Sequence, residues 1–132
     1  MTDDLGKLVL RVSVGVLILM HGIFKLQNGV GGIVGMLGNH GLPGILAYGV
    51  YIGEVIGPVL VILGLFTRIG AMLIAVNMLV AVALAHMPEL FSLGQMGGWA
   101  LELQGMFLFA SISVGLLGAG RFSVGGARGR YN

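Results

Sequence analysis

The sequence contains no cysteine and very few charged residues. Without cysteine, a protein has no thiol nucleophile, no disulfide, no thiolate ligand for an iron–sulfur cluster and no CxxCH heme attachment. Any redox chemistry therefore depends on a bound cofactor or on a partner protein. Only seven basic and five acidic residues occur among 132, whereas about a quarter of the residues in a soluble domain are charged. So few charges cannot cover the surface of a soluble globule of this size.

Apolar residues fill the sequence instead. They make up 57% of the chain, and the mean hydropathy is +1.02. A bilayer core of about 30 Å is crossed by roughly 20 helical residues. Stretches of suitable length occur four times, at about 8–26, 45–66, 69–86 and 99–118. We therefore predict an all-α fold, an integral membrane four-helix bundle in which residues 1–132 form one domain.

The basic residues indicate how such a bundle is oriented. Only Lys25 falls near the outer side, and the others fall at the opposite side: Lys7, Arg11, Arg68, Arg121, Arg128 and Arg130. Basic residues concentrate in cytoplasmic loops, so we expect both termini and a tight turn at Thr67–Arg68 to be cytoplasmic. Residues 119–132 are expected to form a cytoplasmic tail, which is short and disordered from Arg121 to Asn132. The first apolar run lacks a small-residue cleavage site, which argues against a removed signal peptide.

The first outer loop, residues 27–44, contains a helical pattern within a glycine-rich sequence. Val30, Ile33, Val34 and Leu37 recur at helical spacing, which is typical of a short helix in the membrane interface or of a re-entrant segment. Seven glycines in the same loop are equally typical of a flexible connector. Both interpretations stay open.

Polar and small residues within the spans predict where the helices meet. Ionisable groups in a span cost roughly 2.5–3.5 kcal/mol each on insertion scales. The first span has one stripe of such residues, which should face the bundle: Arg11, Val14, Gly15, Ile18, His21, Gly22 and Lys25. In the second span a GxxxG repeat beside Glu54 predicts close packing, with a kink near Pro58; its glycines are Gly49, Gly53 and Gly57.

The third and fourth spans contribute further polar candidates. Asn77 lies within the third span, and His86 lies at its outer end. In the fourth span Gln104 lies opposite a face that consists of Glu102, Gly105, Met106, Phe109 and Ser113. At about 1.5 Å per residue, most of these ionisable groups fall in the outer third of the membrane, and Glu54 lies nearer the middle. We expect a polar pocket that opens to the outer side.

A purely structural interpretation of the same residues is available. The opposite charges could offset one another, with Lys25 paired to Glu102. Arg11 would then extend to the inner headgroups. His21 and Asn77 would make interhelical hydrogen bonds that fix the helix register.

The order of these motifs resembles a known family. An arginine enters the first span, and His21-Gly22-x-x-Lys25-Leu26 ends it. The other shared motifs are Gly53-Glu54, Gly57-Pro58, Gly64-Leu65-Phe66-Thr67-Arg68, Asn77-Met78, Ala85-His86, Glu102 and Gly118-x-Gly120-x-Phe122-Ser123. Over nearly its whole length the chain resembles the DoxX family of small bacterial four-helix membrane proteins. The resemblance implies a membrane oxidoreductase setting, because related proteins form part of thiosulfate:quinone oxidoreductases and others belong to oxidative-stress and thiol-handling complexes.

We therefore predict a subunit of a quinone-linked redox system in the bacterial inner membrane. His21 and Lys25 would donate hydrogen bonds to the quinone, and Glu54 or Glu102 would relay protons. This assigns the catalytic roles to His21, Lys25, Glu54 and Glu102. The residues predicted to bind the cofactor are His21, Lys25, Asn77 and His86. No residue is assigned to a metal in this interpretation.

Other functions are compatible with the same pattern. A transition-metal or heme site would use His21, Glu54, His86 and Glu102, one from each helix. A non-catalytic membrane anchor or assembly subunit would use the polar stripe and the GxxxG face to bind a partner. A transporter would need oligomerisation to enclose a pathway. The expected partners are the lipid bilayer and either another protein or further copies of the chain. Nucleic acid is not expected, because the basic residues are few and scattered.

Overall fold

A computed structural model describes residues 2–86, 91–94 and 97–132, and the side chains of residues 85 and 86 lie outside this description. The chain is helical, as predicted, and the described part contains no strand beyond one isolated bridge between Leu93 and Trp99. The α-helices are α1 (Thr2–Asn28), α2 (Gly31–Asn39), α3 (Gly57–Leu63), α4 (Thr67–Ala81) and α5 (Glu102–Leu117). Three shorter segments are the 3-10 helix η1 (Gly44–Gly49) and the π-helical segments η2 (Ile52–Ile56) and η3 (Val82–His86).

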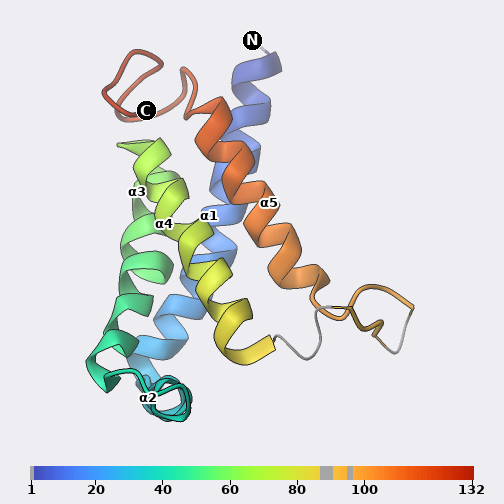
Figure 1. The fold of residues 1–132 in the computed structure, drawn as a ribbon. Helices are drawn as coiled ribbons and strands as arrows, with labels where there is room; N and C mark the ends of the chain where they lie inside the picture. Colours follow the sequence, from blue (N-terminus) through green and yellow to red (C-terminus); the bar gives the residue numbers. More distant parts are fainter. Residues whose placement is uncertain (1, 87–90, 95–96) are drawn as a thin grey trace.

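These segments build a bundle with both chain ends together (Figure 1). Within the described residues, three helical segments are long and apolar enough to cross a membrane: Thr2–Asn28, Gly44–Leu63 and Thr67–Leu84. The apolar helix α5 runs beside them but has 16 residues, which correspond to about 24 Å. The fourth span and the cytoplasmic orientation of the termini therefore stay predictions. The N-terminus and the C-terminal segment, residues 118–132, lie at the same end, where the Arg121 amide donates to Asp4 at 3.2 Å.

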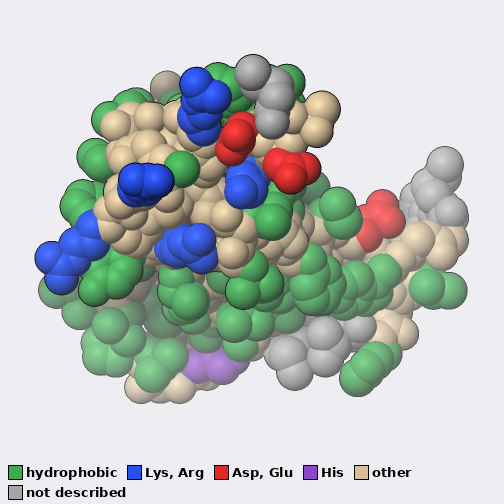
Figure 2. All heavy atoms as spheres, turned by 90° about the horizontal axis from the view of Figure 1, so that it is seen from above, with side chains coloured by type: hydrophobic (Ala, Val, Ile, Leu, Met, Phe, Trp, Pro, Cys, Tyr) green, Lys and Arg blue, Asp and Glu red, His purple; other side chains and the backbone are tan. Residues whose placement is uncertain are grey.

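Apolar side chains fill the centre of the bundle and also cover its outside. Ile18, Val61, Ile74 and Val114 are at most 1% exposed and belong to one core cluster, contributed by α1, α3, α4 and α5. Large apolar residues such as Val9 and Met72 are more than 60% exposed. An apolar surface of this kind suits contact with lipid tails. Charged side chains gather at the end that holds the termini, as the view from above shows (Figure 2).

The second long helical segment, Gly44–Leu63, which we call the second rod, is irregular where the sequence predicts a kink. Pro58 has no N–H and cannot donate to the backbone carbonyl of Glu54 in the normal helical pattern. The preceding turn is π-helical, and the Gly57 amide donates to the Ile52 carbonyl. The rod ends at Gly64, which is left-handed with φ of 72°. The turn thus lies at Gly64–Phe66, and the predicted position at Thr67–Arg68 is wrong because Thr67 already begins α4.

The loop predicted on the outer side, residues 27–44, contains a helix, α2, in agreement with the first of the two interpretations. Leu37 is 4% exposed and packs in a second apolar cluster with Val30, Ala47 and Val50. This cluster fastens α2 to η1 at the end of the bundle opposite the termini (Figure 1). Whether α2 lies in the interface or re-enters the membrane stays a prediction.

Arg11 is buried, so the expectation that it extends to the headgroups is wrong. The side chain is 2% exposed. Its Nη1 donates to the carbonyls of Val61 at 2.9 Å and Ile62 at 2.7 Å, and its Nε donates to Ala119 at 3.2 Å. Its Nη2 donates to the Phe122 carbonyl. The last carbonyls of a helix have no intrahelical donor, and the five N–H groups of a guanidinium can satisfy several of them at once.

The C-terminal segment is folded against the bundle, and the expectation that it is disordered is wrong. Asn132 is 6% exposed, and its Oδ1 accepts hydrogen bonds from the Thr67 amide at 3.0 Å and the Thr67 hydroxyl at 2.7 Å. The Arg68 amide donates to the Tyr131 carbonyl at 2.9 Å. The segment therefore caps the first turn of α4, where helical N–H groups have no partner of their own.

Candidate functional site

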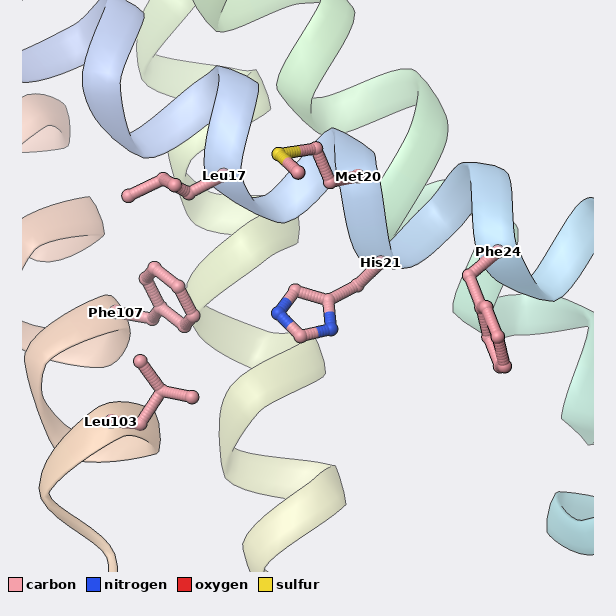
Figure 3. Close-up of a pocket in the computed structure, with 6 residues that line it drawn as sticks. All are labelled: Leu17, Met20, His21, Phe24, Leu103 and Phe107. Carbon is pink, nitrogen blue, oxygen red and sulfur yellow. The ribbon is translucent and has the colours of Figure 1, made fainter.

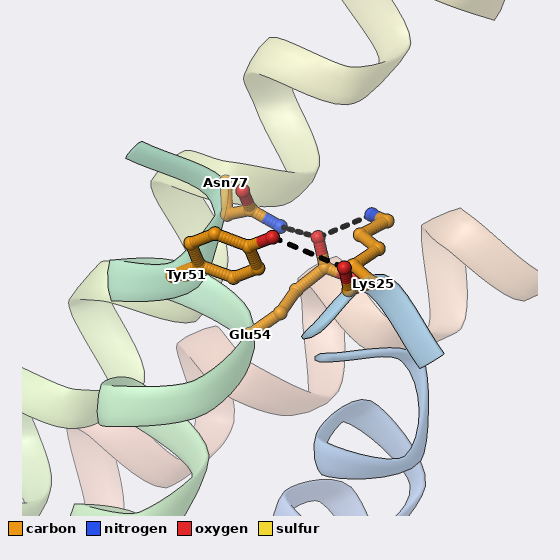
Figure 4. Close-up of polar contacts among 4 residues, drawn as sticks. All are labelled: Lys25, Tyr51, Glu54 and Asn77. Atoms are coloured by element: carbon orange, nitrogen blue, oxygen red, sulfur yellow. Dashed lines mark hydrogen bonds and ion pairs between the residues drawn. The ribbon is translucent and has the colours of Figure 1, made fainter. Parts of the chain in front are cut away.

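A charged network connects α1, η2 and α4 (Figure 4). The Nζ of Lys25 lies 2.5 Å from Glu54 Oε2, and the same oxygen accepts a hydrogen bond of 3.2 Å from the Asn77 side-chain amide. The Tyr51 hydroxyl donates to the Lys25 backbone carbonyl at 3.0 Å, which joins the end of α1 to the second rod. The side chain of Glu54 is 4% exposed, whereas that of Lys25 is 30% exposed. The carboxylate is thus buried, and its cationic partner reaches the surface.

Two glycines allow the helices to come close enough for this network. Gly22 of α1 lies against the backbone carbonyl of Glu54, and a Cβ at Gly22 would collide with that oxygen. Gly53 lies against Asn77, and a Cβ there would collide with the amide side chain. Small residues at such crossings let helix backbones approach. The Glu54 backbone is therefore held between α1 and α4, and its side chain reaches both Lys25 and Asn77.

A cavity of about 230 Å³, which we call the polar cavity, lies beside the network. Its lining residues are His21, Lys25, Glu54, Met78, Ala81, Leu103, Gln104 and Phe107. The four polar side chains come from three elements, α1, η2 and α5, and the remaining lining is apolar. A concave site with a few converging polar groups in an apolar wall is the usual form of a small-molecule site.

A second hollow of about 360 Å³, which we call the apolar groove, lies between α1 and α5 (Figure 3). Its lining residues are Leu17, Met20, His21, Phe24, Leu103 and Phe107. His21, Leu103 and Phe107 line the polar cavity as well, so the two hollows adjoin. The rings of His21 and Phe107 meet edge to face, with centroids 6.0 Å apart and an interplanar angle of 79°.

Four of the predicted site residues come together in this region: His21, Lys25, Glu54 and Asn77. Glu102 is exposed at the start of α5, with its carboxylate beside Gly98, and it does not line the polar cavity. The pairing of Lys25 with Glu102 in the structural interpretation is wrong, because Lys25 pairs with Glu54. The side chain of His86 lies outside the described residues. The catalytic and cofactor-binding roles of all these residues stay predictions.

Gln104 is a polar residue of the cavity to which the sequence analysis assigned no role, because it lies opposite the face that contains Glu102. The inward face of α5 contains Gln104 with the buried residues Phe107, Ser111 and Val114. On the opposite face, where the sequence places Glu102, Met106 and Phe109 together, Met106 is 65% exposed and Phe109 is 60% exposed. Both faces of α5 are apolar, and a hydropathy pattern cannot distinguish a lipid-facing side from a bundle-facing side. The spacing of Gln104, Phe107, Ser111 and Val114 by three or four residues is the signal that identifies this face afterwards.

The metal alternative needs residues that lie only partly within the described structure. Among the described side chains of residues 2–84, 91–94 and 97–132, no three from His, Cys, Asp or Glu are grouped closely enough to hold a metal ion. The predicted set includes His86, whose side chain is not described. The metal or heme site therefore stays a prediction.

The same chain can be compared with known proteins. The DoxX family matches residues 6–87, which is more than half of the chain. The chain belongs to the DoxX family. It is also 35% identical over 116 residues to "Putative oxidoreductase CatD" of Bacillus subtilis (strain 168), which covers 88% of this chain and 81% of that protein. No solved structure shows a significant match. The resemblance found in the sequence motifs is thus confirmed.

Membership of the DoxX family and the three long apolar helices identify a membrane protein. The matched residues extend from α1 to η3 and include the whole network of Lys25, Glu54 and Asn77. Gln104 lies beyond the matched residues, on α5. The ion pair of this DoxX protein is therefore built within the family match, and one wall of the polar cavity is built outside it.

Proposed function

We propose that this DoxX protein is the membrane subunit of a quinone-linked redox system in the bacterial inner membrane, and that the polar cavity binds the quinone ring. The observation that carries the proposal is the Lys25–Glu54 pair, which lies in the wall of a cavity. A charge within a membrane span is costly and usually marks a ligand site or a proton path. Similarity to a protein whose name contains "oxidoreductase" supports the redox class.

The residues of the polar cavity match the hydrogen-bonding needs of a quinone ring. A quinone has two carbonyl oxygens, which accept hydrogen bonds. The Lys25 ammonium has three N–H donors, of which Glu54 takes one, and the Gln104 amide has two. Neutral His21 has one ring N–H donor. The apolar wall, including Phe107, would contact the faces of the ring.

Glu54 is the residue that we assign to proton transfer. Reduction of a quinone to a quinol takes up two electrons and two protons. In the described part of the chain Oε2 of Glu54 accepts from Lys25 and Asn77, and Oε1 accepts no hydrogen bond. We assign proton uptake and release to Oε1, because it is the oxygen of Glu54 that accepts no hydrogen bond in the described part of the chain. We assign the electrons to a reduced donor on a partner protein, because the chain has no cysteine for a redox centre of its own.

Direct binding tests this proposal. The purified protein in lipid nanodiscs would be titrated with a benzoquinone that has no tail, and the lipid extract would be searched for co-purified quinone. Gln104→Leu should weaken binding about tenfold, the effect of losing one hydrogen bond of roughly 1.4 kcal/mol. Gln27→Leu is the matched control, because Gln27 is exposed on α1 and lines neither hollow.

The outcomes separate the proposed function from its main alternative. One quinone bound per chain, weakened by Gln104→Leu and unchanged by Gln27→Leu, would support the redox subunit. A protein that carries no quinone and binds none on titration would refute it. That result would favour a non-catalytic anchor or assembly subunit, and the copurifying partner would then define the function.

A further inference from the structure

The two hollows differ in chemistry although they share a wall. The polar cavity holds Lys25, Glu54 and Gln104, whereas apart from His21 the lining of the apolar groove consists of Leu, Met and Phe side chains. The shared residues are His21, Leu103 and Phe107. A polar site that continues into an apolar channel matches a ligand with a polar head and an apolar tail.

We propose that the apolar groove holds the hydrocarbon tail of the quinone, and that the ring reaches the polar cavity from the lipid side between α1 and α5. This inference rests on the proposed function, because it concerns the same ligand. Leu17, Met20 and Phe24 line the groove and are 50%, 61% and 64% exposed. A surface this apolar and this open faces the acyl chains of the bilayer, which is where a lipid-soluble quinone is dissolved.

The edge-to-face pair of His21 and Phe107 stands at the junction of the two hollows (Figure 3). A ring that passes from the groove to the cavity must pass this pair. His21 then presents a ring nitrogen beside the polar cavity, while Phe107 presents only carbon. His21 is therefore placed to form the first hydrogen bond with an arriving quinone carbonyl.

The groove should act mainly through access and orientation. A tail that moves from lipid to an apolar protein groove exchanges one apolar surrounding for another, so burial adds little affinity. The benefit is a tail path that lets the ring sit in the cavity without exposing hydrocarbon to polar groups. If the groove is filled, the tail must leave the cavity beside Lys25, where it meets charge and water.

Two methionines with nearly equal exposure allow a matched test. Met20 lines the groove and is 61% exposed, whereas Met72 lies on α4 away from both hollows and is 63% exposed. Met20→Trp should fill the groove, and Met72→Trp should add the same bulk to another lipid-facing surface. Leu17→Trp is a second groove variant in case Met20→Trp does not fold. Folding is checked by monodispersity and by thermal unfolding in detergent.

The probes are two benzoquinones with the same ring, one with a decyl tail and one without a tail, titrated against the protein in nanodiscs. At equilibrium, Met20→Trp should weaken binding of the tailed quinone about tenfold or more, which is 1.4 kcal/mol. It should leave the equilibrium affinity for the tail-less quinone nearly unchanged, because a filled groove alters the path of the ring and not the contacts of the bound ring. Met72→Trp should change neither. Equal effects on both quinones, or no effect on either, would overturn the groove assignment. Binding of both quinones by the wild-type protein would still support the proposed function. A wild-type protein that binds neither quinone would refute the proposed function, and the groove assignment with it.

Discussion

Replacement of Lys25 by methionine should destabilise the protein because it leaves a buried carboxylate without its cation. The Glu54 side chain is 4% exposed and would keep only the hydrogen bond from Asn77. Removing one partner of a fully buried ion pair costs about 3–5 kcal/mol. Lys25 is 30% exposed, so water already screens part of the interaction. We therefore expect Lys25→Met to lower the free energy of unfolding by about 2–3 kcal/mol.

The reciprocal substitution should cost less. Glu54→Gln keeps an acceptor for Asn77 and leaves Lys25 free to extend toward the surface, so we expect a loss of about 1 kcal/mol. The double variant removes both charges and should be nearly as stable as Glu54→Gln alone. The predicted coupling between the two positions is thus about 2–3 kcal/mol in magnitude. The Tyr51 hydroxyl donates to the backbone carbonyl of Lys25 rather than to its side chain, so this hydrogen bond is retained in every variant.

Unfolding in mixed micelles, followed by circular dichroism, measures these differences. Lys7→Met on the same helix is the control, because Lys7 forms no ion pair in the described part of the chain, and it should change the stability by less than about 0.5 kcal/mol. Equal losses from the two single variants, or strictly additive losses in the double variant, would refute the reasoning. Either result would mean that the ion pair does not shield a buried carboxylate.

Three further substitutions, at Arg11, Gly22 and Asn132, test the packing that positions the site, and the first two have a comparison variant. Arg11→Met should lower the free energy of unfolding by about 3 kcal/mol and speed hydrogen exchange in the C-terminal segment, because several buried carbonyls lose their donor. Arg11→Lys should not restore the slow exchange, since an ammonium lacks the planar fork of a guanidinium. Gly22→Ala should lower the stability by about 1–3 kcal/mol, because its Cβ would collide with the Glu54 carbonyl. In the control Gly32→Ala, the added Cβ has no atom within 4 Å, and the stability should rise by about 0.5 kcal/mol in the same unfolding assay. Asn132→Ala should lower the free energy of unfolding by about 1–2 kcal/mol, and the thermal unfolding midpoint with it, because α4 loses its cap.

The sequence by itself determined that this is a helical membrane protein with polar groups inside its bundle. Hydropathy and segment length are local properties, and a bilayer demands long apolar helices whatever their packing. The stripe on α1 was readable over most of its length, because a period of 3.6 residues places Arg11, Val14, Ile18 and Gly22 on one side, and all four are buried. The prediction that the whole stripe faces the bundle is wrong for His21, which is exposed, and Lys25 is only half-buried. The motif order was sufficient to recognise the DoxX family.

The tertiary structure alone decided which partners these residues meet. Two acidic residues, Glu54 and Glu102, were available to Lys25, and the choice between them depends on helix rotation and contact distance rather than on local sequence. Gly22 and Gly53 bring η2 between α1 and α4, so that Glu54 is the carboxylate within reach. The position of Gln104 on the bundle-facing side of α5 has the same origin. Both faces of α5 are apolar, so only the packing of the helix against its neighbours decides which face points into the bundle.

The same reason explains the end of the bundle that holds the chain termini. Arg11 near a predicted membrane boundary is expected to reach the headgroups, and a glycine-rich polar segment is expected to be disordered. Instead, the unpaired carbonyls at the end of α3 and the unpaired amides at the start of α4 lie close enough for Arg11 and Asn132 to satisfy them. Hydropathy shows where a chain meets lipid, but hydrogen bonds between helix ends far apart in the sequence arise only when packing brings those ends together.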